Sequence, residues 1–159
     1  MFAATRPEDL ASRETLLSMS GLDFMRAILD GTLSQPPITQ VMDYALDRVA
    51  DGEVAFRGTP AFRHCNPMGG VHGGWYGTLL DSCMACAVMT KVPKGAWYST
   101  LEYKINVTRA LPVGVEVLAI GTVDHAGRST AVAHGILRGA ADGRLYATGS
   151  TTCLIMTPR

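Results

Sequence analysis

One stretch of the chain decides its fold: residues 64–91 read HCNPMGGVHGGWYGTLLDSCMACAVMTK. From Gly73 to Thr90 every residue is apolar, small or neutral, apart from the carboxylate of Asp81. Because a helix that is apolar on every side is usually buried, this segment predicts a buried central helix. An unpaired carboxylate is costly in such a place, so Asp81 is either satisfied by hydrogen bonds or takes part in chemistry.

The loop before this helix brings polar groups and glycines to the helix start. Asn66, His72 and the pair Gly73-Gly74 lie in it. A helix N-terminus offers free N–H groups and the positive end of the helix dipole, which suit a developing oxyanion. Glycine lets a ligand approach the backbone closely. A possible anion site, a polar side chain and a buried carboxylate therefore follow one another within a short segment.

The composition predicts one globular domain with a substantial core. The chain has 159 residues, and its 14 basic residues balance its 14 acidic residues. No basic stripe points to nucleic acid and no acidic block points to a disordered tail. The first residues lack the basic and apolar regions of a signal peptide, and the apolar helix carries Asp81 and several glycines. We therefore expect a cytoplasmic protein without a membrane span.

The cysteines invite a redox or zinc hypothesis, because Cys83 and Cys86 form a C-x-x-C motif. The motif lies inside the predicted helix rather than at its N-terminus, where thiols are activated. No second cysteine pair or H-x-x-x-H motif completes a zinc site. We predict no metal site and interpret the cysteines as small core residues. The alternative, a redox or metal protein, requires thiols that reagents reach in the folded state.

The remaining sequence predicts a helical start followed by strands. Residues 8–30 are expected to be helical, with Ser12 or Ser20 as a cap and Gly31 as the end. Alternating apolar residues and turn signals predict six strands, over residues 39–50, 53–59, 96–110, 113–125, 129–138 and 144–156. The last four are expected in meander order. In the strand over residues 96–110, the odd-numbered residues are expected to form the apolar face: Trp97, Ser99, Leu101, Tyr103, Ile105 and Val107.

These elements indicate an α+β fold in which an antiparallel sheet wraps around one buried central α-helix. The only helix apolar enough to cover the sheet is the one that begins at Gly73. We expect a single domain over residues 36–159 and an additional N-terminal helical segment over residues 1–35.

The element order resembles the hotdog fold, and the motif resembles that of the PaaI-like (phenylacetic-acid-degradation) acyl-CoA thioesterases, the 4-hydroxybenzoyl-CoA thioesterase type. Their pattern N-x-x-G-x-x-H-G-G stands here as residues 66–74, followed by six neutral residues and Asp81. The later stretches TLEYKINVTRALPVG (100–114) and HAGRSTA (125–131) are also similar to that family. The resemblance covers roughly residues 40–157, so the N-terminal segment lies outside it.

The resemblance implies hydrolysis of acyl-CoA thioesters with aromatic or short- to medium-chain acyl groups, coenzyme A being part of the substrate and no cofactor being needed. It implies that Asp81 is the nucleophile or the general base, and that the Gly73 N–H polarises the thioester carbonyl. Asn66 would position the carbonyl or the attacking water, and His72 would organise the loop. Thr100, or Ser99 if the register differs, would hold water.

The resemblance also implies a set of residues that bind the coenzyme A part of the substrate: Arg109, Arg128, Ser129 and Thr130. One departure stands out, because some relatives carry a hydroxyl one turn after the acid where this chain has Ala85. Each role has a purely structural alternative. Asp81 could be a capped buried acid, Asn66 could bridge a turn, and the two arginines could be solvated charges at strand ends.

The spacing of the central motif points to a site shared between subunits. Asp81 follows Gly73 by eight residues, about 12 Å along a helix axis, and one thioester carbon cannot easily contact both. We expect a homodimer, and the resemblance extends this to a dimer of dimers, a homotetramer. The helix face that carries Asp81 is expected to leave room for substrate because its other residues are small: Gly74, Gly77, Thr78, Ala85 and Val88.

Two other functions remain open at the level of sequence. A hydratase or dehydratase of the same fold would pair an acid with a histidine, but no histidine follows Asp81 in the helix. A non-catalytic acyl-CoA-binding regulator would keep the pocket and the basic residues without needing Asp81. Six large residues are candidates either for an acyl pocket or for the core: Trp75, Tyr76, Met84, Met89, Trp97 and Tyr98.

Overall fold

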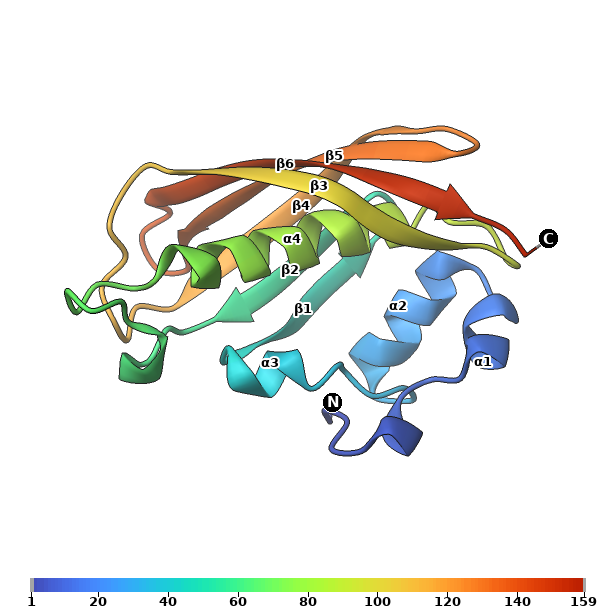
Figure 1. Cartoon of the computed structure of the whole chain (residues 1–159), viewed down its shortest axis with the longest axis horizontal. Coiled ribbons are helices and arrows are strands. Elements are labelled where there is room, and N and C mark those ends of the chain that lie inside the picture. The colour runs from blue at the N-terminus through green and yellow to red at the C-terminus, as the bar shows by residue number, and fades with distance from the viewer. Residues whose placement is uncertain (1, 159) are drawn as a thin grey trace.

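A six-stranded antiparallel sheet curls around one long helix in the computed structural model, which describes residues 2–158. The helix, α4 (Gly73–Met89), lies between the two ends of the curl, with β1 and β2 on one side and β3 and β6 on the other (Figure 1). The strand order is β1-β2-β4-β5-β6-β3. This is the hotdog arrangement, and it confirms the predicted fold class.

The other elements have the following bounds. The short helices are α1 (Arg13–Leu17), α2 (Gly21–Asp30) and α3 (Ile38–Val41). The strands are β1 (Tyr44–Ala50), β2 (Glu53–Gly58), β3 (Trp97–Val107), β4 (Val117–Ala126), β5 (Thr130–Gly139) and β6 (Leu145–Met156). Single 3₁₀ turns form at Pro7–Asp9 and Phe62–His64.

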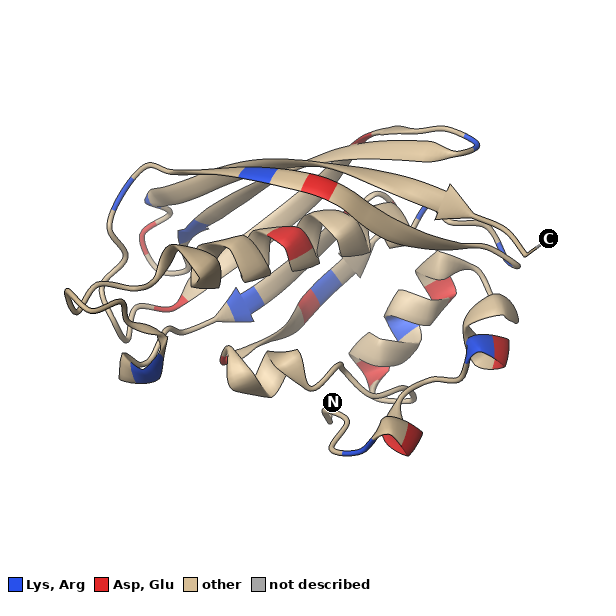
Figure 2. Ribbon diagram, viewed as in Figure 1, with Lys and Arg blue, Asp and Glu red and all other residues tan. Residues whose placement is uncertain are grey.

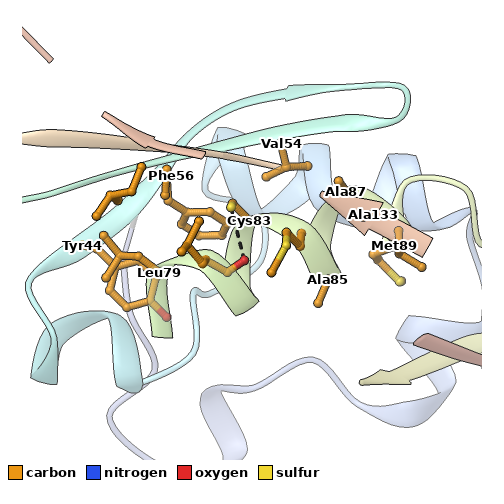
Figure 3. Close-up of a cluster of buried hydrophobic side chains, with 14 of the residues drawn as sticks. Tyr44, Val54, Phe56, Leu79, Cys83, Ala85, Ala87, Met89 and Ala133 are labelled. Carbon is orange, nitrogen blue, oxygen red and sulfur yellow. Dashed lines mark hydrogen bonds between the residues drawn. The ribbon is translucent and has the colours of Figure 1, made fainter. Parts of the chain in front are cut away.

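The core is built around α4, as its uniformly apolar sequence predicts. Leu79, Leu80 and Met84 are completely buried, and Figure 3 shows how side chains of the sheet surround this helix. Cys83 is also buried, and its thiol donates a hydrogen bond to the Leu80 carbonyl at 3.3 Å. Burial raises the pKa of Cys86 to about 12, so this thiol stays protonated at neutral pH. The interpretation as a core residue is thus confirmed for Cys83, whereas Cys86 is only partly buried and packs against the core.

Glycines let α4 approach the sheet closely. Gly121 of β4 pairs with Gly135 of β5, which pairs with Gly149 of β6, so three glycines form a row across three strands. A Cβ on Gly121 would lie 2.2 Å from the Cys83 carbonyl oxygen, and a Cβ on Gly135 would lie 2.8 Å from Met84. This glycine row therefore sets the distance between helix and sheet.

The predicted order of the last four strands is wrong in one respect. β4, β5 and β6 form a meander, but β3 pairs with β6 at the edge of the sheet instead of with β4. The chain from Val107 to Val117 crosses from one edge of the sheet toward the other side. Local turn signals do not reveal this, because the pairing of β3 depends on the curl of the whole sheet around α4.

Two predictions at the N-terminal end are corrected in detail. The helix expected over residues 8–30 is divided, because Ser12 and Ser20 each cap a separate helix by accepting the backbone N–H three residues on. Gly31 ends α2 in the left-handed conformation, as predicted. The strand expected from residue 39 begins only at Tyr44, since α3 forms first, after Pro36-Pro37.

The N-terminal segment packs directly against the rest of the chain. The Gly21 N–H donates to the Val92 carbonyl at 2.9 Å, and Gln35 accepts a hydrogen bond from the backbone of β1. In Figure 1, α2 lies beside the C-terminal end of α4. Within the described residues, none of the helices combines the length and the hydropathy needed to cross a membrane.

Candidate active site

Asp81 lies on the part of α4 that the sheet does not fully cover. It is the one acidic position on this helix (Figure 2). Its side chain is partly buried, and its Oδ1 accepts a hydrogen bond from the Thr100 hydroxyl at 3.2 Å. Burial raises the pKa of Asp81, and the Thr100 hydrogen bond offsets part of that shift. The result is a carboxylate that is desolvated and oriented and that, among residues 2–158, has no cationic partner, as a base or a nucleophile requires.

A β-bulge in β3 directs Thr100 toward this carboxylate. Thr100 pairs with Cys153 and Glu102 pairs with the preceding Thr152, so Leu101 is an extra residue. Before the bulge Tyr98 and Thr100 face α4, whereas after it Tyr103 and Ile105 do. The prediction that the odd-numbered residues form the apolar face is therefore wrong for the first half of β3, where Ser99 and Leu101 are exposed. Of the two candidate hydroxyls, Thr100 contacts Asp81.

The loop before α4 is held by the two polar side chains that the motif singled out. His72 is the N-cap of α4, and its Nδ1 accepts the Gly74 N–H at 2.9 Å. Asn66 Oδ1 accepts the N–H groups of Met68 and Gly70 at 2.9 and 3.2 Å. Both side chains thus shape the loop, and for Asn66 this is the turn-bridging role that was the alternative to catalysis. The Asn66 Nδ2 group makes no hydrogen bond within residues 2–158 and stays available as a donor.

The first N–H of the helix is also free. Within the described chain, the Gly73 N–H has no hydrogen-bond partner, as expected at the first position of a helix. A cleft of about 380 Å³ opens here, lined by Asn66, Gly73, Tyr76 and Arg109 among others. The fold therefore brings two predicted catalytic residues and one predicted coenzyme A ligand to one surface. A cationic side chain and an unpaired N–H at a positive helix end make this cleft suitable for an anionic ligand.

Asp81 does not line that cleft, because it lies about 12 Å further along α4. The predicted coenzyme A residues are also separated. Thr130 pairs with Leu154 and Val107 pairs with Ala147, so the ends of the two flanking strands are about 23 Å apart along β6. Arg109 follows β3, whereas Arg128 and Ser129 lie in the β4–β5 turn at the opposite end of the molecule (Figure 1). Within one chain the predicted site residues thus form three separate groups. These are the loop before α4 with Arg109, the Asp81–Thr100 pair, and the β4–β5 turn with Thr130.

Part of the face of α4 that was expected to receive substrate is covered by β3. A Cβ on Gly77 would lie 3.3 Å from the Tyr103 hydroxyl, so Gly77 serves close packing between helix and strand. The open face is the next one around the helix, which carries Ser82, Cys86 and Met89. Sequence reasoning missed Ser82 and also Tyr44, whose hydroxyl lies 2.9 Å from the Ser82 hydroxyl. Only the adjacency of Ser82 to Asp81 could have drawn attention to it.

Comparison with known proteins identifies the family of the chain. The profile of the thioesterase superfamily matches residues 68–147, half of the chain, which contain all of α4 and the strands β3, β4 and β5. The chain belongs to the thioesterase superfamily. A search of curated proteins finds no match.

Solved structures place this chain among the PaaI-like hotdog proteins. It resembles a thioesterase family protein from Silicibacter pomeroyi in fold, with a TM-score of 0.75, 20% identity, and coverage of 84% of this chain and 99% of the other. A phenylacetic acid degradation-related protein from Ralstonia eutropha is 26% identical, with a TM-score of 0.74 and coverage of 82% and 98%. A hypothetical thioesterase protein from Streptococcus pneumoniae, whose structure was determined with coenzyme A, is 25% identical, with a TM-score of 0.66 and coverage of 74% of this chain and 88% of the other.

Proposed function

We propose that this thioesterase hydrolyses acyl-CoA thioesters with Asp81 as the catalytic carboxylate. The observation that carries the proposal is the Asp81–Thr100 pair, because it provides a desolvated carboxylate on α4 with a hydroxyl of β3 beside it. Membership in the superfamily supports thioester chemistry. The relative determined with coenzyme A supports coenzyme A as the thiol part of the substrate.

The reaction needs a nucleophile and a donor at one carbonyl. Asp81 either attacks the thioester carbon itself or takes a proton from a water that attacks it. The unpaired Gly73 N–H donates to the oxyanion that forms, and the Asn66 amide is a second donor or a holder of water. The C–S bond then breaks, and the thiolate of coenzyme A leaves and takes up a proton that derives from water. If water attacked, the acid is released at once; if Asp81 attacked, a water molecule then hydrolyses the acyl–Asp81 anhydride, which releases the acid and restores the carboxylate. Thr100 holds water or orients Asp81 through its hydroxyl.

Because Gly73 and Asp81 lie too far apart to meet one carbon, we propose that two subunits combine to form each site. β3 is an edge strand with an unusual number of exposed apolar side chains, including Leu101 at 58% and Tyr103 at 47% exposure. An unpaired strand edge of this kind is a natural pairing surface. If two copies meet along β3, the loop of one chain can face the Asp81 of the other.

The assembly in solution should accordingly be at least a dimer. Light scattering at micromolar concentration should give twice the chain mass of 17.0 kDa or a higher multiple. Leu101→Glu should weaken the assembly and lower activity at low protein concentration, because a charge would be buried in the contact. Val41→Glu, at a 63% exposed apolar residue of α3, serves as the control. A fully active monomer would contradict the shared site.

Coenzyme A release from a panel of acyl-CoA esters tests the function itself. Hydrolysis should release free thiol from aryl or short- to medium-chain esters. Binding without release would favour the regulator, and loss of enoyl-CoA absorbance without release of thiol would favour a hydratase. Both of these outcomes would contradict the proposal.

Arg109 and Arg128 should contribute to KM through the phosphates of coenzyme A. Arg109 lines the cleft at Gly73, and a site made by two chains can bring in the β4–β5 turn from the other subunit. Replacing both by Ala should raise KM at least about tenfold for the coenzyme A ester, as expected for two lost charge-assisted contacts. KM for a truncated pantetheine thioester should change little. Equal losses for the two substrates would show that these arginines do not bind the nucleotide.

A further inference from the structure

The bulge in β3 decides which side chain lies beside Asp81. Directly after the bulge, Glu102 pairs with Thr152 of β6. If that register continued without an extra residue, Leu101 would take the place opposite β6 that Thr100 now holds. Because side chains alternate between the two faces of a strand, Leu101 would then face α4 and Thr100 would face away from it. The bulge therefore gives the carboxylate a hydroxyl as its neighbour instead of an isobutyl group.

A side chain of β6 holds the backbone of this bulge. A bulge disrupts the regular ladder of hydrogen bonds, and buried backbone groups must then find other partners. The Thr151 hydroxyl donates to the carbonyl of Glu102, the residue directly after the extra one, at 2.7 Å. Thr151 is only 1% exposed, so water does not compete for this bond. The hydroxyl thus fixes the strand at the point where its alternation changes.

The contacts of Thr151 also lead toward the carboxylate. Cys153 lies two residues further along β6, on the same face as Thr151, and is completely buried. It pairs with Thr100, and its thiol lies within hydrogen-bonding reach of both threonine hydroxyls. Thr100 in turn donates to Asp81 at 3.2 Å. Thr151 is therefore joined to the Asp81–Thr100 pair through the backbone of the bulge and through a packed thiol.

We propose that Thr151 is a positioning residue of the active site, whose hydroxyl holds the β3 bulge so that Thr100 stays against Asp81. Thr151 is buried and does not line the cleft at Gly73, so it acts through Thr100 and not by contact with substrate. The inference rests on the proposed function, since it takes Asp81 as the catalytic carboxylate.

The titration of the Asp81 carboxyl tests the proposal without any turnover. It is followed by NMR on protein labelled with ¹³C-aspartate, and Asp81→Asn identifies the signal. Thr151→Val removes the hydroxyl but keeps the branched shape. It should raise the pKa of Asp81, because a displaced Thr100 hydroxyl no longer stabilises the charged form. Thr151→Ser keeps the donor and should titrate like the wild type.

Thr90→Val is the matched control for a general loss of stability. Thr90 is 5% exposed, and its hydroxyl donates to the Ala87 carbonyl at 2.6 Å and accepts the Gly52 N–H at 2.8 Å. It follows Asp81 by nine residues, about 13 Å along the axis of α4. This variant should lower Tm, as Thr151→Val does, but it should leave the pKa of Asp81 unchanged.

Deletion of Leu101 tests the bulge itself. Without this residue, Thr100 and Glu102 can keep their present partners on β6 while the strand alternates regularly, so Thr100 still faces α4. In the deletion variant, Thr151→Val should no longer change the pKa of Asp81. Because the comparison is made within one background, any effect of the deletion on assembly cancels.

A double variant tests whether Thr151 acts through Thr100. In the chain that keeps Leu101, the combined Thr100→Val and Thr151→Val variant should titrate like Thr100→Val alone, since both changes act on one contact. In turnover, Thr151→Val should lower kcat by up to about tenfold, the value of one hydrogen bond, with KM unchanged.

The outcomes separate this inference from the proposed function. If Thr151→Val leaves the Asp81 titration unmoved, or moves it only as far as Thr90→Val does, Thr151 does not position the carboxylate. An effect that adds to that of Thr100→Val, or persists without Leu101, overturns the proposal as well. If the deletion variant does not fold, the double variant decides alone. If the titrations shift as expected but the wild type hydrolyses no acyl-CoA, the positioning role stands and the proposed catalytic function is wrong.

Discussion

Replacing Asp81 with Asn should lower kcat by about a hundredfold or more while the protein stays folded. Asn has nearly the same shape but can neither attack the thioester nor accept a proton from water. Loss of a positioned acid–base group costs on the order of 10²–10⁴ in rate. Thiol-release kinetics and thermal unfolding on the same preparation measure the two effects together. Normal hydrolysis by the Asn variant would show that the catalytic assignment is wrong.

The pH profile gives an independent readout of the same residue. Because burial raises the pKa of Asp81, the active carboxylate is lost as the pH falls, and this loss begins above the range of an exposed Asp. Thr100→Val removes a hydrogen bond that favours the charged form, so the fall in kcat/KM should move to higher pH. A profile that Thr100→Val does not move would mean that Asp81 is not the group that titrates.

The same pKa shift predicts how Asp81 affects stability. A carboxyl whose pKa is higher in the folded state than in the unfolded state destabilises the fold once it is ionised. The Asn variant should therefore be more stable than the wild type at neutral pH. The difference should vanish below about pH 3.9, the unfolded pKa of Asp, where both states are protonated. A variant that is inactive because it unfolds would make Asp81 a structural residue.

Replacing Gly121 with Ala should destabilise the fold strongly, because the added methyl group would collide with the backbone of α4. Its Cβ would lie 2.2 Å from the Cys83 carbonyl oxygen and 2.5 Å from the Met84 nitrogen, which are atoms that cannot rotate away. Helix and sheet must then separate, and overpacking of this kind costs about 3 kcal/mol or more. In a chain of this size, that corresponds to a decrease of roughly 6–12 °C in Tm.

The matched control is Gly70→Ala in the loop before α4. A Cβ there would lie 3.6 Å from the Asn66 side chain, an ordinary contact, and Gly70 has no positive φ. Its Tm should change little. If Gly121→Ala unfolds at the wild-type temperature, the glycine row does not set the spacing between α4 and the sheet.

The central features of the fold could be predicted from the sequence because their signals are local. The unbroken apolar run of α4 required burial on all sides, and alternating residues with turn signals marked the strands. Asp81 was identified for the same reason, as a charge where burial makes charge costly. The motif led to Asn66, Gly73 and His72. The structure shows how Asn66 and His72 shape the loop, and none of the residues it describes accepts the Gly73 N–H.

The register and the partners of β3 were decided by tertiary structure. The bulge at Leu101 turns Thr100 toward Asp81, although alternation alone assigned Thr100 to the other face. The edge position of β3 depends on how far the sheet curls, and the curl depends on contacts between strands distant in sequence. The family resemblance assigns Arg109 and the residues of the β4–β5 turn to the same ligand. For the same reason, they nevertheless lie at opposite ends of the folded molecule.

By itself, the sequence determined that an antiparallel sheet surrounds one buried helix with a single carboxylate, because hydrophobic burial and turn preferences act over a few residues. Tertiary structure alone decided what surrounds that carboxylate. It aligned Gly121, Gly135 and Gly149 into one row, since cross-strand pairing joins residues far apart in the chain. It also packed the N-terminal segment over the open face of α4, because that face and the edge of β1 would otherwise remain in water.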